Sequence, residues 1–221
     1  MTTAAFRRAL PSGLSVASTA AEHAEQLEAL QKAVFPTLDP AELFRAEHYH
    51  KHIELFPEGQ FVALDGDRVV GMTSTLRLPN DFLGADHTFA EVIEGGWLTS
   101  HDPEGEWMYG VDVGTHPEYR GRGVARALYA ARQESAQRLG LAGQVTVGML
   151  SGFGPLKDQL SAREYYDQLV AGDRDDPTVS AQRRVGFKLR GLVSGYVNDP
   201  VCDGYGALLV LPSENDVAWP A

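Results

Sequence analysis

The residues best suited to chemistry form a glycine-rich turn between an apolar segment and an amphipathic one. Residues 111–126 read VDVGTHPEYRGRGVAR, and Gly121 and Gly123 lack side chains that would block the approach of an anion. A helix that begins near Arg122 would aim its unpaired N–H groups and the positive end of its dipole at this turn. Further positive charge comes from the surrounding arginines Arg120, Arg122 and Arg126. The pattern predicts a site for a diphosphate group.

Two other phosphate-binding motifs do not fit the chain. A nucleotide P-loop requires Gly-Lys-Ser or Gly-Lys-Thr, and neither tripeptide occurs here. A dinucleotide-binding turn requires a third glycine near position 126, where Arg126 stands. A turn that is rich in glycine for structural reasons alone is the remaining alternative.

The spacing Arg120-x-x-Gly123-x-Ala125 matches the Q/R-x-x-G-x-G/A signature of the GNAT superfamily, so the chain resembles these coenzyme-A-dependent N-acyltransferases. The resemblance implies that the diphosphate is the pyrophosphate of acetyl-CoA. It also implies that the strand before the turn splays from its neighbour and binds the pantetheine arm. The residues implied in cofactor binding are Val113, Thr115, Arg120, Gly121, Arg122, Gly123, Val124, Ala125 and Arg126.

A second part of the superfamily signature, a helix that ends in Gly-Phe before a strand, matches Val185-Gly186-Phe187. Other stretches resemble the acetyltransferase module that some bacteria fuse to a carbon–nitrogen hydrolase domain. These stretches are Ala46-Glu-His-Tyr, Phe56-Pro-Glu-Gly-Gln-Phe61, Thr99-Ser-His-Asp-Pro103, Glu164-Tyr165 and Asp176-Pro177. The resemblance covers about residues 14–211, and we expect this chain of 221 residues to hold the module without the hydrolase.

Length and composition indicate one domain over residues 1–221. With 43% hydrophobic residues the chain can bury one sizeable core, expected at about 14–211, followed by a C-terminal tail at 212–221. The formal net charge of -11 disfavours a nucleic-acid-binding protein, because such proteins neutralise phosphates with a dense basic face. Arginines nevertheless gather between Glu118 and Arg138, where an anionic cofactor would bind.

Cysteine content and hydropathy indicate a cytoplasmic protein. Cys202 is the single cysteine, so no intramolecular disulfide can form, and we expect its thiol to be a spectator. The N-terminal residues carry arginines without an apolar run behind them, which is not typical of a secretory signal. No segment has the length of a membrane span, and we expect no membrane association.

Hydrophobic periodicity and turn residues predict an α/β fold with a mixed, mostly antiparallel sheet of about seven strands flanked by helices. The expected strands are residues 14–17, 61–64, 69–76, 107–113, 145–149, 187–193 and 205–211. The expected helices begin near Thr19, Asp39, Arg122, Ser161 and Asp176. Strands 107–113 and 145–149 should be parallel, since the helix between them makes a right-handed crossover. We expect a long loop at 79–100 and an inserted helical segment at 151–176.

Acyl transfer to an amine needs a route for the ammonium proton and donors for the developing oxyanion. A carboxylate on or before strand 107–113 could take the proton directly or through water, which nominates Glu106 as the catalytic base. Asp112, Glu104 and His101 are the next candidates. A solvated carboxylate at the mouth of a strand is the alternative for each of them.

Many GNAT proteins carry a tyrosine four residues before the glycine of the Gly-Phe pair, where its phenol protonates the departing CoA thiolate, but this chain has Gln182 there. Tyr165 is therefore the first candidate for the catalytic acid and Tyr166 the second, because a phenol with a pKa of about 10 suits a thiol leaving group. Tyr196 is a third candidate. The alternatives are tyrosines that only pack in the core, or a reaction without a dedicated acid.

Three histidines raise the question of a metal site, because His48 and His52 lie one helical turn apart with His50 between them. No carboxylate completes an H-E-x-x-H pattern, and His50 would point away from the other two. We therefore expect a polar helix face and no metal.

The motifs together predict an acetyl-CoA-dependent N-acetyltransferase that moves an acetyl group to a primary amine by direct attack in a ternary complex. Its partners would be acetyl-CoA and an amine-bearing small molecule or peptide, with a homodimer as an open alternative. The competing hypothesis is a CoA-binding sensor or catalytically silent module, which Gln182 keeps open. The acceptor and the length of the acyl chain stay open.

Overall fold

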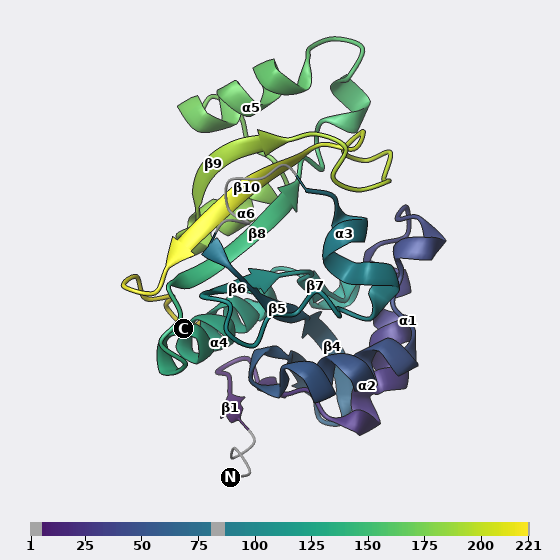
Figure 1. Cartoon of the computed structure of the whole chain (residues 1–221), viewed down its shortest axis with the longest axis vertical. Coiled ribbons are helices and arrows are strands. Elements are labelled where there is room, and N and C mark those ends of the chain that lie inside the picture. The colour runs from purple at the N-terminus through teal and green to yellow at the C-terminus, as the bar shows by residue number, and fades with distance from the viewer. Residues whose placement is uncertain (1–5, 81–86, 221) are drawn as a thin grey trace.

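The computed structural model describes residues 6–80 and 87–220, which form two five-stranded sheets with helices packed against them (Figure 1). The first sheet has the order β1-β2-β3-β4-β7, and its strands are β1 Arg7–Ala9, β2 Ser15–Ser18, β3 Phe61–Asp65, β4 Arg68–Thr73 and β7 Gly114–Thr115. The second has the order β5-β6-β8-β10-β9, and its strands are β5 Thr75–Leu78, β6 Trp107–Gly110, β8 Gly143–Met149, β10 Gly206–Pro212 and β9 Lys188–Val193. The α-helices of the described residues are α1 Ala24–Val34, α2 Ala46–Leu55, α3 Phe89–Ile93, α4 Val124–Arg138, α5 Ala162–Ala171 and α6 Val179–Val185.

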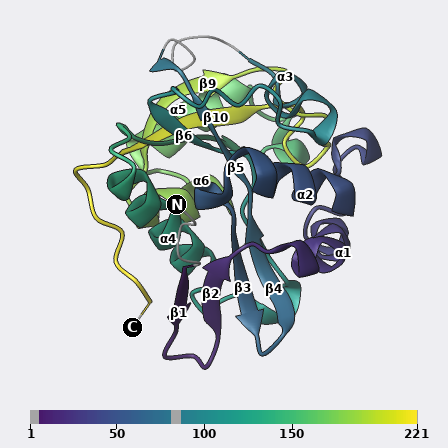
Figure 2. The same cartoon turned by 60° about the horizontal axis from the view of Figure 1, so that its bottom comes forward.

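Strand pairing confirms the expected mixed, mostly antiparallel arrangement. Among the described strands β6 and β8 form the parallel pair, and α4 makes the crossover between them. Figure 2 shows β1 to β4 side by side, with α1 next to β4, against which it packs. Helix α4 packs against both sheets through contacts with β3 and β8, so it fixes their relative position.

The division into two sheets is the main feature that the sequence pattern does not reveal. The expected strand 69–76 is interrupted at Ser74, and the expected strand 107–113 is interrupted after Gly110. At these breaks the chain leaves one sheet for the other. The breaks are tied together, because Val111 N donates to Ser74 O (3.0 Å) and Thr73 Oγ1 donates to Asp112 O (2.7 Å).

The expected loop at 79–100 contains a helix. Thr88 caps α3 by accepting a hydrogen bond from Glu91 N, and the Glu91 carboxylate accepts from Thr88 N (2.7 Å). This reciprocal pair is a Thr-x-x-Glu capping box, a signal that the sequence analysis overlooked. Residues 81–86 of the expected loop lie outside the described residues.

Helix starts agree with expectation where a capping side chain is present. Ser161 and Glu164 form the predicted capping box of α5, and Asp176 Oδ1 accepts from Val179 N at the start of α6 (2.9 Å). The capping box expected at Thr19 does not form, because Ala20 is the N-cap of the first helical turn, Ala21–His23. Asp39 caps only the short 3-10 turn Pro40–Glu42, and α2 begins separately at Ala46.

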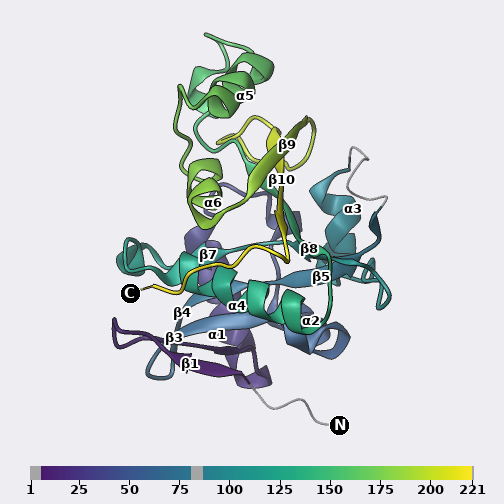
Figure 3. The ribbon, with the colours of Figure 1, turned by 90° about the vertical axis from the view of Figure 1, so that its left-hand side faces the viewer.

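The C-terminal residues pack against the domain. Figure 3 shows this segment running alongside α4, and the Gln133 side chain of α4 donates to the carbonyls of Pro212 (2.9 Å) and Asn215 (2.6 Å). Trp219 stacks on Phe6 with ring centroids 6.1 Å apart. The segment expected to be a tail is therefore held to both α4 and the N-terminal residues.

Candidate active site

A cavity of about 710 Å³ opens where the two sheets separate. It begins at Arg120 in the cofactor loop, follows α4 and β8, and ends against α1 and residues 196–201. The wall is mostly apolar side chains with a few polar groups among them, a composition typical of small-molecule sites.

The glycine-rich turn adopts the conformation that an anion site needs. Gly121 (φ 75°) and Gly123 (φ 79°) both lie in the left-handed region, which side chains disfavour. Gly123 is the N-cap of α4 and no side chain caps it. The first hydrogen bond of the helix is Ala127 N to Gly123 O (3.0 Å), so the N–H groups of the preceding residues project from the helix end.

The side chains of Arg120, Arg122 and Arg126 around the turn are exposed. Arg120 lines the cavity with Ala125, while Arg122 lies over the ring of Tyr119 with its guanidinium carbon 4.9 Å from the ring centroid. Tyr119 in turn donates to Asp65 Oδ2 (2.8 Å), which anchors the loop to the end of β3.

The two residues proposed to contact a pantetheine arm also line the cavity. Val113 lies in the β6–β7 connection and Thr115 in β7. The Thr115 hydroxyl is buried and has no hydrogen-bond partner among the described residues. A buried hydroxyl without a partner costs free energy unless a ligand satisfies it, so Thr115 fits a polar, amide-bearing ligand in this cavity.

The structure does not bring the two predicted catalytic residues to the cavity. Glu106 is exposed directly before β6, whereas the cavity opens beyond the other end of that strand. Tyr165 on α5 is 1% exposed and donates to Asp176 Oδ2 (2.9 Å). Neither they nor Tyr166 form part of the cavity wall, because β6 and α5 position them elsewhere.

The cavity wall contains two phenols, Tyr129 and Tyr196, of which only Tyr196 was weighed from the sequence. Tyr129 was missed because it belongs to none of the motifs that the sequence shows, and only the fold places it in the cavity wall. Gln182 of α6 also lines the cavity and donates to the Tyr129 hydroxyl (3.3 Å). The Gln182 Oε1 atom is buried and has no partner among the described residues.

A buried cation and a buried carboxyl lie behind this part of the wall. Arg132 is 1% exposed and donates to Thr73 Oγ1 (3.4 Å), while its Nε and Nη2 atoms have no partner among the described residues. Burial lowers the pKa of Arg132 to about 10. Asp112, which lines the cavity, accepts from Ser74 N (2.6 Å), and burial raises its pKa to about 6.

The far end of the cavity is closed by hydrogen-bonded polar groups. Tyr196 and Tyr109 share a hydrogen bond between their hydroxyls (2.9 Å), and His87 Nε2 lies 2.8 Å from the Tyr109 hydroxyl. Asp199 is 2% exposed, lines the cavity and accepts from Thr37 Oγ1 (3.0 Å). This end of the cavity wall therefore carries a phenol and a carboxylate.

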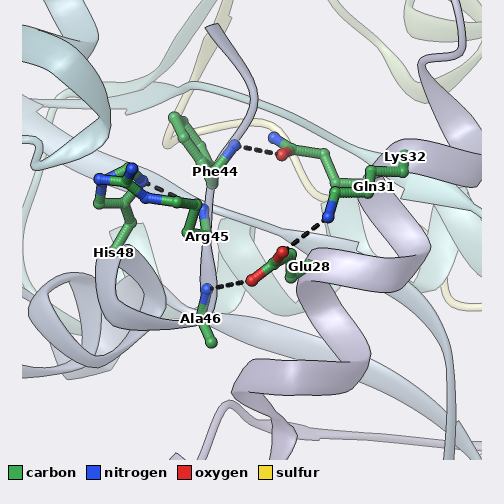
Figure 4. A network of polar contacts seen from close by, with 7 residues as sticks. All are labelled: Glu28, Gln31, Lys32, Phe44, Arg45, Ala46 and His48. Carbon is green, nitrogen blue, oxygen red and sulfur yellow. Dashed lines mark hydrogen bonds and ion pairs between the residues drawn. The ribbon is translucent and has the colours of Figure 1, made fainter. Parts of the chain in front are cut away.

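A polar network fixes the helices that form this end. Figure 4 shows Gln31 and Glu28 of α1 reaching the segment before α2: Gln31 accepts from Phe44 N, and Glu28 accepts from Ala46 N (2.8 Å). An ion pair with Lys32 (2.6 Å) lowers the pKa of Glu28, so its charge is available to the start of α2. The network holds Gln31 in the cavity wall.

His48 and His52 of α2 are buried and serve packing in this structure, whereas His50 is exposed. His52 Nε2 lies 2.7 Å from Gly96 O, and burial lowers the pKa of His52 to about 4. His48 Nδ1 accepts from Arg45 N (3.1 Å) at the helix start. Among residues 6–80 and 87–220 no group of three or more candidate ligand side chains is arranged to hold a metal ion.

Comparison with known proteins assigns this arrangement of split sheets, glycine-rich helix start and connecting cavity to a known family. The model of the acetyltransferase (GNAT) family matches residues 24–169. The chain belongs to this family and is an acyltransferase.

Two relatives support the assignment of the chain to this family. The chain is 30% identical over 186 residues to the uncharacterized N-acetyltransferase YkwB of Bacillus subtilis, covering 84% of this chain and 82% of YkwB. It is 35% identical over 170 residues to the probable hydrolase YhcX of the same organism, covering 77% of this chain but only 33% of YhcX. The chain thus spans about a third of the length of YhcX, in keeping with the resemblance to a module fused to a hydrolase.

The structure of the GNAT-like decarboxylase GphF in complex with isobutyryl-CoA has the same fold, with a TM-score of 0.74 and 21% identity. The similarity covers 90% of this chain and 98% of GphF.

In the described part of the chain, none of the helices combines the length and apolar character required to cross a bilayer.

Proposed function

We propose that this protein transfers an acetyl group from acetyl-CoA to a primary amine within a ternary complex. The observation that carries the proposal is a single cavity that reaches from the cofactor loop to the polar end at Tyr196 and Asp199. A donor and an acceptor held in one cavity can react directly, because their proximity replaces the entropy cost of an encounter.

Three features support CoA as the donor carrier. The left-handed turn at Gly121 and Gly123 and the uncapped start of α4 suit a pyrophosphate, with Arg120 beside it. The buried Thr115 hydroxyl would bond an amide of the pantetheine arm. Val113 lies directly before β7 on the cavity wall, so its backbone N–H is the proposed donor to the acetyl carbonyl as negative charge develops there.

The opposite end supports a cationic acceptor with an apolar body. Asp199 supplies a carboxylate, and Phe35 and Phe89 contribute apolar walls. A carboxylate attracts an ammonium group strongly where water is largely excluded. Because Asp199 also accepts from Val201 N (2.9 Å), its position is fixed from the backbone.

The decisive experiment follows thiol release from acetyl-CoA against small amines, polyamines, aminoglycosides and peptide N-termini, with calorimetric titration of CoA in parallel. Saturable release that depends on the amine supports the proposal. CoA binding without release for every amine would instead identify a CoA-binding sensor. The absence of both would overturn the proposal together with its account of the cofactor loop.

A second candidate function is decarboxylation of a carboxylated acyl-CoA. The observation that favours it is the TM-score of 0.74 with GphF, described as a GNAT-like decarboxylase, over 90% of this chain. Incubation with malonyl-CoA in the absence of any amine separates the two candidates. A decarboxylase would form acetyl-CoA and release carbon dioxide, whereas the proposed N-acetyltransferase would leave malonyl-CoA unchanged.

A further inference from the structure

We propose that Tyr129 is the catalytic acid that protonates the departing sulfur of CoA, and that Arg132 acts through Tyr129 as a positioning residue. The inference rests on the proposed function and adds the residue that handles the proton. It begins from the contacts of the Tyr129 hydroxyl in the cavity wall.

The hydroxyl of Tyr129 is arranged to give up its proton toward the cavity. Its oxygen accepts a hydrogen bond from Gln182 Nε2 (3.3 Å), and it has no other hydrogen-bond partner among the described residues. The proton of the hydroxyl is therefore free for a ligand. Tyr196, the other cavity phenol, shares its hydroxyl with Tyr109 and lies at the acceptor end.

The ring of Tyr129 is held between fixed partners. Phe187 meets it edge-on with centroids 5.3 Å apart, and the guanidinium carbon of Arg132 lies 5.2 Å from the ring centroid. Tyr129 of α4 lines the cavity together with Thr146 and Gly148 of β8. A group held this rigidly needs little reorganisation when charge develops beside it.

Arg132 supplies the charge that a phenolate would need. Burial raises the pKa of Tyr129, while Arg132 and the hydrogen bond from Gln182 lower it and the nearby Asp112 raises it. Arg132 is almost fully buried, and its Nε and Nη2 atoms have no partner among the described residues. A buried guanidinium with unused donors is costly, and a transient negative charge on Tyr129 would offset that cost.

Starting from the neutral amine, the proton balance closes without another reactant. After the amine has attacked the thioester, the C–S bond breaks, the Tyr129 O–H bond breaks and an S–H bond forms. The phenolate then takes a proton from the positively charged amide nitrogen, so an N–H bond breaks and the phenol is restored. The products are the neutral amide and CoA with a free thiol.

The test compares the wild type with Tyr129→Phe, using acetyl-CoA and the amine that gives most thiol release. We expect kcat to fall about 100-fold with KM for acetyl-CoA unchanged, as for loss of a general acid. Tyr49→Phe is the matched control, since Tyr49 is also a buried tyrosine, with its hydroxyl on Met72 Sδ (3.7 Å) and no part in this cavity. Equal kcat in the wild type and Tyr129→Phe would overturn the assignment.

The positioning role of Arg132 is tested through the pKa of Tyr129, which a purely structural role of Arg132 would leave unchanged. NMR of ring-labelled tyrosine reports the ionisation of Tyr129, and Arg132→Met should raise its pKa and lower kcat, with partial recovery in Arg132→Lys. An unchanged Tyr129 pKa in folded Arg132→Met would overturn the positioning role.

A second use of the same NMR signal separates failure of this inference from failure of the proposed function. If no amine is acetylated by the wild type, the proposed function fails. The NMR signal of Tyr129 is then recorded in the complex with CoA and in the complex with desulfo-CoA, and the two spectra are compared. A response that requires the sulfur supports Tyr129 as its neighbour. The same response to both ligands, or none to either, overturns the inference.

Discussion

A few polar side chains that lie where the two sheets separate determine what the cavity can do. Tyr129, Gln182, Thr115 and Asp112 line the cavity, and Arg132 is buried beside the ring of Tyr129. Thr115 Oγ1, Gln182 Oε1 and two nitrogens of Arg132 depart from the ordinary expectation that buried polar atoms are paired. Such departures are typical of sites that acquire their remaining partners from a substrate.

Gly123 gives a first prediction at this scale. Gly123→Ala would place a side chain at φ 79° and 2.9 Å from the Pro220 side chain, so the helix start would shift. We expect CoA affinity, measured by calorimetry, to fall about tenfold, which corresponds to about 1.4 kcal/mol. The matched control is Gly140→Ala at the other end of α4, where φ is 69° and the space is open. Equal loss of affinity in both variants would contradict the role of the turn.

The pH dependence of stability gives a second prediction. Burial raises the pKa of Asp112 from 3.8 to about 6, so its carboxylate is less favourable in the fold than in the unfolded chain. This cost is absent below about pH 4 and is complete above about pH 7. The unfolding free energy of the wild type should therefore fall by about 3 kcal/mol more than that of Asp112→Asn over this interval.

The measurement for Asp112 is urea denaturation at several pH values. The difference in pH dependence is the readout, because losing the charge near Arg132 also changes the absolute stability of Asp112→Asn. Parallel pH dependences in the two proteins would show that the Asp112 carboxyl keeps an ordinary pKa in the fold.

The elements of the molecule divide into those that build the cavity and those that do not. The β6–β7 connection, α4, β8 and α6 contribute directly to its wall, and the short helix α3 contributes Phe89. Helix α5 packs against β9, away from the cavity wall. The two helices have the same type of capping box, which makes them a matched pair for experiment.

The capping boxes of α3 and α5 should affect activity differently. Thr88→Ala and Ser161→Ala each remove a capping hydroxyl, and we expect each to lower the unfolding free energy by about 1 kcal/mol. Only Thr88→Ala should raise KM for the acceptor amine, because α3 holds Phe89 in the cavity wall. Steady-state kinetics measures KM for the amine, and urea denaturation measures the unfolding free energy. A comparable change of KM in Ser161→Ala would mean that α5 contributes to the site.

On the scale of the whole molecule, Phe6 and Arg8 near the start of the described chain meet Trp219 near its end, beside α4. Trp219 donates to Glu134 Oε1 (2.6 Å) and lies under the guanidinium of Arg8, whose carbon is 4.2 Å from its ring centroid. The same segment reaches the N-cap of α4 through Pro220. Packing of the C-terminal segment and the geometry of the cofactor loop are thus connected.

Trp219→Ala tests this connection. We expect the unfolding free energy to fall by about 2 kcal/mol, because the substitution removes stacking on Phe6, the contact with Arg8 and the bond to Glu134. The control is Trp97→Ala, since Trp97 is 38% exposed and its loss should cost less. The midpoints of urea denaturation measure the loss of unfolding free energy, given an unchanged m-value. Equal losses in the two variants would contradict a specific role for the C-terminal segment.

The amino-acid sequence alone determined the local features of this protein. The glycine-rich turn that leads into α4, the capping box at Ser161 and the parallel pair that flanks α4 were all predicted, because backbone freedom and side-chain periodicity act over a few neighbouring residues. The family also follows from such a local feature, the spacing from Arg120 to Ala125.

Only the tertiary structure decided which side chains face the cavity. Glu106 and Tyr165 have suitable chemistry, but β6 and α5 carry them away from it, whereas Tyr129 reaches it from within a buried helix stripe. The physical reason is that the cavity exists only because the chain changes sheets at Ser74 and after Gly110. Those breaks are held by hydrogen bonds between residues distant in the chain, from Thr73 and Ser74 to Asp112, which no local pattern encodes.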